Sequence, residues 1–157
     1  MSSDQVIGID LGGTAIKLAR FNRAGDVLAE RQIPTPQPSV PGAVTMAFCE
    51  AIDQLAPDHL AAFVGVGLPG PMDANARTAR ICINLSGWEE VPLADWLEPR
   101  LQRQVTLAND GNCALVGEAW LGAARGFDDV VLLTLGTGVG GGVLLGGALF
   151  RDRKSVV

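Results

Sequence analysis

The sequence is poor in charged residues, in basic residues above all, and in cysteine. Only 18% of its 157 residues are charged and 48% are hydrophobic, which excludes an intrinsically disordered chain because disorder requires low hydrophobicity and high charge. Twelve Lys and Arg against 17 Asp and Glu give a net charge of −5, so the chain lacks the basic field with which proteins bind nucleic acid. The three cysteines, Cys49, Cys82 and Cys113, form no C-x-x-C pair, and we expect buried, reduced thiols.

The N-terminus lacks the pattern of a secretory signal. Asp4 stands where such a signal carries positive charge, and Asp10 interrupts the apolar run that follows. We therefore expect a cytoplasmic protein. The length is typical of one domain, and a chain of this size can bury a core.

One stretch has the length of a membrane span. Residues 130–150 contain no charged side chain, and three basic residues follow within the next four positions. The stretch also contains seven glycines, each of which costs a helix about 1 kcal/mol relative to alanine. We therefore predict two strands, 130–135 and 143–145, joined by a glycine loop, with no membrane partner. A membrane-spanning helix is the alternative.

The first thirty residues show the same arrangement of strand, glycine turn and strand. Apolar runs at 6–10 and 15–21 flank a turn at 11–14, and a third strand is expected at 27–33. These three strands predict an antiparallel start to a sheet.

Strands and helices alternate in the rest of the chain. Four prolines between residues 34 and 41 indicate an extended connector. The elements expected after it are a helix at 43–56, a strand at 61–68, a short helix from Leu93, a strand at 105–108 and a helix at 112–124 whose apolar side carries Leu115, Val116, Ala119, Trp120 and Ala123. This order predicts an α/β fold with a mixed sheet, antiparallel at its start and parallel where helices intervene.

Asp10 is an acid at the end of an apolar strand, next to Gly12, Gly13 and Thr14. On its own it is explained equally well as a turn-forming residue. Glycines at such a turn let backbone N–H groups converge on an anion, and the Thr14 hydroxyl adds a donor. A carboxylate beside that cradle suits Mg²⁺, which takes one or two protein carboxylates together with phosphates and water. The pattern indicates a site for a metal-bound nucleotide.

A second glycine loop covers residues 135–142. Gly136, Gly138 and Gly141 match the G-x-G-x-x-G spacing of dinucleotide-binding proteins, but that motif must open a helix, and the residues that follow have the composition of a strand. Both glycine loops are able to donate N–H groups to phosphate. Glycines that serve only the positive φ angles of a hairpin are the alternative for each.

Asp110 follows the strand at 105–108 and precedes a helix, at the end of a strand where α/β sheets place their ligands. Capping of that helix is the simpler interpretation of this residue alone. A carboxylate in this place is also a candidate general base toward a substrate hydroxyl. The segments 69–71 and 84–88 are loops suited to binding hydroxyl groups and equally suited to being ordinary turns.

Taken in order, five motifs strongly resemble the ROK family of sugar kinases, and most closely its bacterial glucokinase-type members. They are G-I-D-L-G-G-T-A-I-K (8–17), G-L-P-G-P-M-D (67–73), N-L-S-G-W (84–88), A-N-D-G-N-C-A-L-V-G-E-A (108–119) and T-L-G-T-G-V-G-G-G (134–142). The resemblance covers about residues 6–150. It implies a ribonuclease H-like mixed-sheet domain of the actin and hexokinase ATPase superfold, and ATP-dependent phosphorylation of a hexose, with glucose favoured, in carbohydrate metabolism.

The resemblance also implies roles for individual residues. Asp110 would be the catalytic base. The residues implied for ATP and Mg²⁺ are Asp10, with Mg²⁺ bound directly or through water, Gly12, Gly13, Thr14 and Lys17 in the first loop and Gly136, Thr137 and Gly138 in the second. Those implied for the sugar are Gly70, Asn84, Asn109 and Asp110. The family has a structural zinc site whose ligands this chain lacks.

The resemblance implies an N-terminal lobe at 1–122, the start of a second, truncated lobe at 123–150 and an atypical charged tail at 151–157. Ala108 and Gly111 stand where many relatives carry Glu and Ala. Because family members continue well past the second loop, we expect a truncated chain that is weakly active or inactive. Whether the complete protein forms a homo-oligomer is left open. The alternatives are the sensor domain of a ROK-type transcriptional regulator, for whose DNA-binding domain the residues before Val6 leave no room, and an actin-like ATPase without a sugar substrate.

Overall fold

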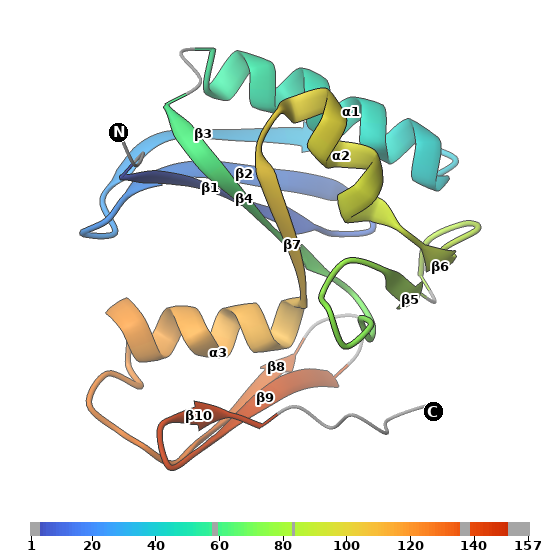
Figure 1. The fold of residues 1–157 in the computed structure, drawn as a ribbon. Coiled ribbons are helices and arrows are strands. Elements are labelled where there is room, and N and C mark those ends of the chain that lie inside the picture. The colour runs from blue at the N-terminus through green and yellow to red at the C-terminus, as the bar shows by residue number, and fades with distance from the viewer. Residues whose placement is uncertain (1–3, 58–59, 83, 136–138, 151–157) are drawn as a thin grey trace. The chain divides into compact units, whose positions relative to one another are not determined.

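A computed structural model describes residues 4–57, 60–82, 84–135 and 139–150, and these residues fold as two units (Figure 1). One unit ends at Ala108 and the other begins at Asn109. The lobe boundary at residue 122, which the family resemblance implies for the complete protein, stays a prediction.

The first unit is built on a five-stranded mixed sheet. Its spatial order is β3-β2-β1-β4-β7, in which β1, β2 and β3 form an antiparallel meander and β4 runs parallel to β1. The strands are β1 (Gln5–Leu11), β2 (Ala15–Asn22), β3 (Val27–Pro34), β4 (Ala61–Leu68) and β7 (Gln104–Asn109). The predicted α/β class, the mixed sheet and its antiparallel start are confirmed.

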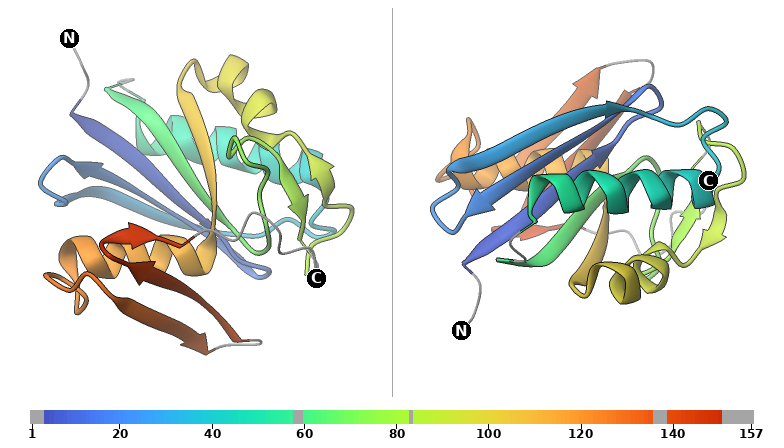
Figure 2. Two further views of the ribbon diagram at one scale, coloured as in Figure 1. Left: turned by 60° about the horizontal axis from the view of Figure 1, so that its bottom comes forward. Right: turned by 90° about the horizontal axis from the view of Figure 1, so that it is seen from above.

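Alternation along the strands decides which face of this sheet is covered. Ile7, Ile9 and Leu11 of β1 are buried, while the residues between them point to the other face. Helix α1 (Pro41–Leu55) covers the buried face with Val44, Phe48, Ala51 and Ile52, as its apolar spacing predicts (Figure 2). It begins two residues earlier than expected because Pro41 is suited to the first turn of a helix.

Among the short elements of the first unit, the helix was predicted from its apolar spacing and the two short strands were not. Helix α2 (Leu93–Leu101) is found where it was expected and packs against α1. Two strands of three residues, β5 (Ala79–Ile81) and β6 (Glu89–Val91), pair as a small antiparallel sheet that was not predicted. Three residues are too few for a period of two to be recognised.

The second unit consists of one helix and an antiparallel sheet in the order β10-β9-β8. Its elements are α3 (Asp110–Leu121), β8 (Val130–Leu135), β9 (Val139–Leu145) and β10 (Ala148–Leu149). Helix α3 lies against one face of the three strands (Figure 2), where Leu115 and Leu144 are buried. A Cβ on Gly142 would come within 3.0 Å of the Leu115 side chain, so this glycine lets the helix approach the strand closely.

Two expectations for this part of the chain are wrong, and the prediction of strands in place of a membrane helix is confirmed. Strand β9 begins at Val139 and not at residue 143, because three consecutive glycines take part in its ladder with β8. Of the stretch 130–150, the described segments 130–135, 139–145 and 148–149 form strands, and no helix among the described residues is long and apolar enough to span a bilayer. Val116 and Trp120 of α3 are 48% and 47% exposed, although the pattern had assigned them to a buried side.

The cysteines differ in burial, which corrects the expectation that all three are buried. Cys82 is buried, Cys49 is half-buried and Cys113 is exposed. Burial raises the pKa of the Cys49 thiol, against the opposing effect of the Arg100 guanidinium. The exposed position of Cys113 follows from its place on the side of α3 away from Gly111 and Leu115, the residues that this helix buries.

Candidate functional site

The glycine turn between β1 and β2 is anchored through its carbonyl groups. Thr35 donates from its hydroxyl to the Gly12 carbonyl at 2.7 Å and from its backbone N–H to the Thr14 carbonyl at 2.9 Å. The Gln37 side-chain amide donates to the Gly13 carbonyl at 3.3 Å. No sequence pattern predicts this role for Thr35 and Gln37, because both lie in the proline-rich connector.

This anchoring decides where the amide groups of the turn point. In a planar trans peptide the N–H of one residue points opposite to the carbonyl of the residue before it. Because the carbonyls of Gly12 and Gly13 face Thr35 and Gln37, the N–H groups of Gly13 and Thr14 face away from them. Gly13 and Thr14 are exposed. The turn therefore presents adjacent backbone donors on its solvent side, and such donors are suited to bind an anion.

A positive φ angle explains neither glycine of this turn. The φ angles of Gly12 and Gly13 are not positive, so the interpretation that the hairpin needs glycine for such angles is wrong here. A Cβ on Gly12 would stand 2.9 Å from the Ala15 carbonyl oxygen, and this close approach explains the glycine. A Cβ on Gly13 would meet nothing within 4 Å. The described part of the structure gives no reason for glycine at residue 13, whereas a ligand that approaches the backbone would.

Asp10 and Lys17 lie directly opposite each other in the β1–β2 ladder, at the mouth of the turn. Both are exposed, and both point to the face of the sheet opposite α1, because Ile9 and Leu11 point toward the helix. The structure thus brings together four of the predicted features in one place: a carboxylate, an ammonium group, the Thr14 hydroxyl and the amides of the turn.

The loop that follows β4 depends on Gly70. This residue has a φ of +113°, and a Cβ would collide with the carbonyl oxygen of Ile81. Asp73 closes the next turn by accepting hydrogen bonds from the backbone N–H groups of Arg77 and Thr78, both at 2.7 Å. Partial burial opposes ionisation of Asp73, but these N–H groups outweigh it and lower the pKa of the carboxyl. Gly70 is therefore required by the fold, whatever it binds.

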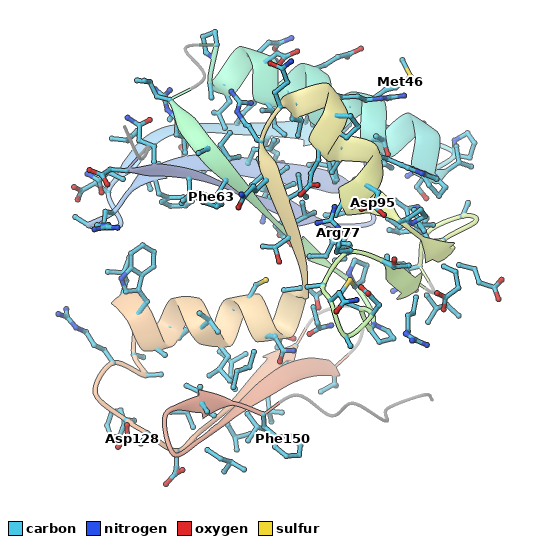
Figure 3. The ribbon with its side chains drawn as sticks, viewed as in Figure 1. Met46, Phe63, Arg77, Asp95, Asp128 and Phe150 are labelled. Atoms are coloured by element: carbon cyan, nitrogen blue, oxygen red, sulfur yellow. The ribbon has the colours of Figure 1, made fainter. Side chains whose placement is uncertain are left out.

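An ion-pair network holds the same loop, and sequence reasoning missed it. Arg77 lies beside Asp95 of α2 (Figure 3). Its guanidinium bridges Asp95 and Glu98 of the same helix, donating from Nε to Asp95 at 2.8 Å and from Nη2 to Glu98 at 2.7 Å. Glu98 also accepts the backbone N–H of Val105 in β7 at 2.9 Å. The hydrogen bonds from Arg77, with that of Val105, lower the pKa of Glu98. Partners 18 and 21 residues away from Arg77 leave no local pattern in the sequence.

The N-L-S-G-W segment is fastened to the proline-rich connector by Ser39. The buried Trp88 indole donates to the Ser39 carbonyl at 2.7 Å, and the Ser86 backbone N–H donates to the Ser39 hydroxyl at 3.2 Å. Asn84 is exposed. Leu85 and Trp88 thus anchor this loop in the core, and Asn84 is left at the surface.

Asn109 and Asp110 have different local roles in the second unit. The Asn109 side chain accepts the backbone N–H of Asn112 at 3.1 Å and is the N-cap of α3. Asp110 is the first helical residue and is exposed, and its Oδ1 accepts the backbone N–H of Gly111 at 2.8 Å. The interpretation that Asp110 caps the helix is wrong, because Asn109 does so. The carboxylate of Asp110 is held at the helix N-terminus, where a negative charge is favoured.

Three predicted residues, Gly136, Thr137 and Gly138, lie outside the described residues, so the second phosphate loop stays a prediction. Gly141, the last glycine of the G-x-G-x-x-G match, is part of strand β9. The match therefore does not open a helix, as a dinucleotide-binding motif must.

Metal-binding residues are sparse. Within residues 4–57, 60–82, 84–135 and 139–150, no group of three or more His, Cys, Asp or Glu is placed to hold a metal ion. A single carboxylate at Asp10 still fits Mg²⁺, because that ion takes most of its ligands from phosphates and water when it accompanies a nucleotide.

Comparison with known proteins gives consistent matches. The protein-family model described as the ROK family matches residues 6–156. The glucokinase of Thermotoga maritima is 37% identical over 152 residues, which are 97% of this chain and 48% of that protein. The N-acetyl-D-glucosamine kinase of Vibrio vulnificus is 34% identical over 95% of this chain and 49% of its own length.

Among solved structures, a ROK family glucokinase from Streptomyces griseus in complex with glucose and AMPPNP matches with a TM-score of 0.88 and 37% identity. The match covers 95% of this chain and 47% of that one. The chain thus spans about half the length of the curated relatives it matches.

Proposed function

The chain belongs to the ROK family, and from that premise we propose that it supplies the first phosphate loop, the sugar loops and the catalytic base of an ATP-dependent hexose kinase. In the proposed reaction the bond between the γ-phosphorus and the oxygen that bridges it to the β-phosphate breaks. A new bond forms between the γ-phosphorus and a hexose hydroxyl oxygen, and the hydroxyl proton passes to the protein. Catalysis of this reaction is mostly positioning and charge neutralisation.

The observation that carries the proposal is that Asn109, and not Asp110, caps α3. The explanation that an acid at residue 110 serves as the N-cap is thereby removed. One oxygen of Asp110 is oriented by the Gly111 N–H, and the side chain is exposed at the end of a strand. A carboxylate with this support is suited to orient an acceptor hydroxyl and take its proton.

The turn at Gly12–Thr14 is proposed as the first phosphate loop. The outward N–H groups of Gly13 and Thr14 and the Thr14 hydroxyl would donate to phosphate oxygens, with Lys17 adding positive charge. Mg²⁺ bound to the phosphates would neutralise their charge, and Asp10 would hold it directly or through water. Gly136, Thr137 and Gly138 are proposed as the second phosphate loop on the resemblance alone.

The sugar is proposed to contact Gly70, Asn84 and Asn109 together with Asp110. Glucose is favoured because curated relatives of this chain are glucokinases and because the Streptomyces griseus structure holds glucose. The exposure of Asn84, on a loop anchored by Ser39 and Trp88, supports its part in this set.

The test uses a chimera in which this chain is followed by the part of the Thermotoga maritima glucokinase beyond the matched segment. The chimera should produce ADP in a glucose-dependent manner in a coupled assay, whereas this chain alone should show little or no turnover. Asp110→Asn should lower kcat by about a hundredfold or more and leave the KM for ATP nearly unchanged. Asp53→Asn, at an exposed carboxylate of α1, is the matched control and should change neither constant.

Two results would contradict the proposal. An unaltered kcat in the Asp110→Asn chimera would show that Asp110 is not the catalytic base. ADP production that does not depend on a sugar would instead favour the actin-like ATPase.

A further inference from the structure

The proline-rich connector between β3 and α1 is fastened near its start to the turn that we propose as the first phosphate loop. Thr35 donates from its hydroxyl to the Gly12 carbonyl at 2.7 Å and from its backbone N–H to the Thr14 carbonyl at 2.9 Å. The hydrogen bonds that orient the peptides of the turn therefore also tie the turn to residue 35.

Four residues later, the same connector is fastened to the N-L-S-G-W loop, which we propose to contact the sugar. The Ser39 hydroxyl accepts the backbone N–H of Ser86 at 3.2 Å, and the Ser39 carbonyl accepts the indole N–H of Trp88 at 2.7 Å. One short segment thus holds both loops of the first unit. We refer to residues 35–39 as the strap.

The two ends of the strap are buried. Thr35 and Ser39 are each 4% exposed, and they are two of the four polar or charged residues that are buried in the described part of the chain. Burying a hydroxyl costs free energy unless it is hydrogen-bonded, and here the two loops provide the partners. Moving either loop away from the strap would break these hydrogen bonds inside the protein.

The residues between the two ends restrict the backbone of the strap. Pro36 and Pro38 alternate with Thr35, Gln37 and Ser39, and each proline ring holds its own φ angle near about −65°. Thr35 and Gln37 are restricted in turn because each precedes a proline. Four of the five residues therefore have limited freedom, and a displacement at one end is carried to the other instead of being absorbed between them.

We propose that the strap sets the position of the phosphate turn relative to the sugar loop, so that Thr35 and Ser39 are positioning residues of the phosphoryl transfer. The inference rests on the proposed kinase function. Transfer requires the γ-phosphorus and the acceptor hydroxyl to be held in reacting geometry, and a misplacement of about 1 Å can cost about a hundredfold in rate. Both residues act through the loops that they hold.

The experiment measures kcat in the chimera with the glucokinase remainder. Thr35→Val removes the hydroxyl at nearly constant shape and should lower kcat about tenfold, and Ser39→Ala should lower it about fivefold. Once either end is released, the strap no longer joins the loops. The double variant should therefore lose about tenfold, and not the roughly fiftyfold of two independent contacts. Thr35→Ser keeps the hydroxyl and should restore kcat to within about twofold of the unsubstituted chimera.

Thr45→Val is the matched control. Thr45 is also buried, and its hydroxyl also donates to a backbone carbonyl at 2.7 Å, that of Pro41. The substitution removes a hydrogen bond of the same kind in α1, outside the strap, and should leave kcat unchanged. Equal losses of kcat in Thr45→Val and Thr35→Val would show that the hydroxyl acts only through general stability, which would overturn the proposal.

A second measurement uses the chain alone, without sugar or ATP. Ser39→Ala removes the acceptor of the Ser86 N–H and no hydrogen bond of the phosphate turn. It should nevertheless shift the amide resonances of Gly13 and Thr14 by more than their line widths in nitrogen–proton correlation spectra, because the strap carries the displacement to the turn. Thr45→Val should leave both resonances in place.

Three further results would overturn the proposal: an unchanged kcat in Thr35→Val, losses that multiply in the double variant, or unmoved Gly13 and Thr14 resonances in Ser39→Ala. A chimera that makes no ADP with glucose would contradict the kinase reaction instead. In that case the spectra of the chain alone would still decide whether the strap connects the two loops.

Discussion

The turn at Gly12–Thr14 and the loop at Pro69–Asp73 both rely on glycine, but for different reasons. In the loop, the φ of Gly70 and the nearby carbonyl of Ile81 leave room for no side chain. In the turn, Gly13 has neither a positive φ nor a neighbour that a Cβ would meet. The loop is further held by the Asp73 turn and the Arg77 network, whereas the turn is held through its carbonyls and keeps its amides outward.

This difference distinguishes glycines that the fold requires from glycines proposed to let a ligand approach the backbone. A glycine that the fold requires should affect stability first and binding second. A glycine that the fold does not require, placed beside outward amides, should affect ligand affinity while leaving stability alone. The following substitutions test this separation.

Gly70→Ala should have the largest effect on stability, a loss of about 3 kcal/mol in the free energy of unfolding, because strain at positive φ adds to the collision with Ile81. Urea unfolding followed by circular dichroism measures it. Gly126→Ala is the matched control: its φ is also positive, at +84°, but a Cβ there would meet nothing, so the loss should be only about 1 kcal/mol. Equal losses at the two positions would mean that the contact with Ile81 contributes nothing.

Gly13→Ala should leave the free energy of unfolding unchanged or raise it by up to about 1 kcal/mol, because alanine fits the native conformation. In the chimera with the glucokinase remainder, the same substitution should raise the KM for ATP about tenfold, since a methyl group would hold the phosphates away from the amides. Gly42→Ala on α1, where a Cβ also meets nothing, should not change the KM. An unchanged KM for ATP in the Gly13→Ala chimera would show that the turn does not bind the nucleotide.

Acidification should have the smallest effect on the free energy of unfolding, and this effect should arise in the loop at Pro69–Asp73, not in the turn at Gly12–Thr14. Hydrogen bonds from Arg77 hold the pKa of Glu98 below its ordinary value of 4.5, and backbone N–H groups overcome partial burial to hold that of Asp73 below 3.8. Their stabilising contribution is complete above those ordinary values and is lost as the pH falls through the lowered ones. The urea concentration at the midpoint of unfolding should therefore decrease as the pH is lowered from about 5 to about 3.

Glu98→Gln should make that pH dependence shallower, because one of the two carboxyl groups no longer titrates. Glu50→Gln, at an exposed position of α1, is the control and should keep the dependence of the unsubstituted chain. Identical pH profiles for Glu98→Gln and the unsubstituted chain would show that the Arg77 network does not stabilise the loop.

Much of the framework could be predicted because its patterns are long and local. The meander of the first thirty residues, α1 and β4 each carry enough apolar residues for a period to be recognised. The elements that were missed are either too short, as β5 and β6 are, or have a composition that conceals them. Strand β9 contains Gly140, Gly141 and Gly142, which by composition belong to a loop and are held in a strand by pairing with β8.

For the candidate site, the sequence predicts which residues take part, and these roles stay predictions. Ordered motifs assign roles to Asp10, Gly13 and Asp110, but no motif distinguishes which of two adjacent residues caps a helix. The choice between Asn109 and Asp110 depends on the backbone geometry at the start of α3. The supports of the site, Thr35, Ser39 and Arg77, act on partners 18 to 49 residues away, and such contacts exist only once the chain has folded.

The burial of Trp88 provides an intrinsic optical reporter. Of the three tryptophans, Trp88 is 2% exposed and donates its indole N–H to Ser39, whereas Trp96 and Trp120 are 40% and 47% exposed. Its emission should be blue-shifted and shielded from acrylamide, while that of the other two is quenched. Spectroscopy on the unlabelled chain can therefore follow the N-L-S-G-W loop during a sugar titration.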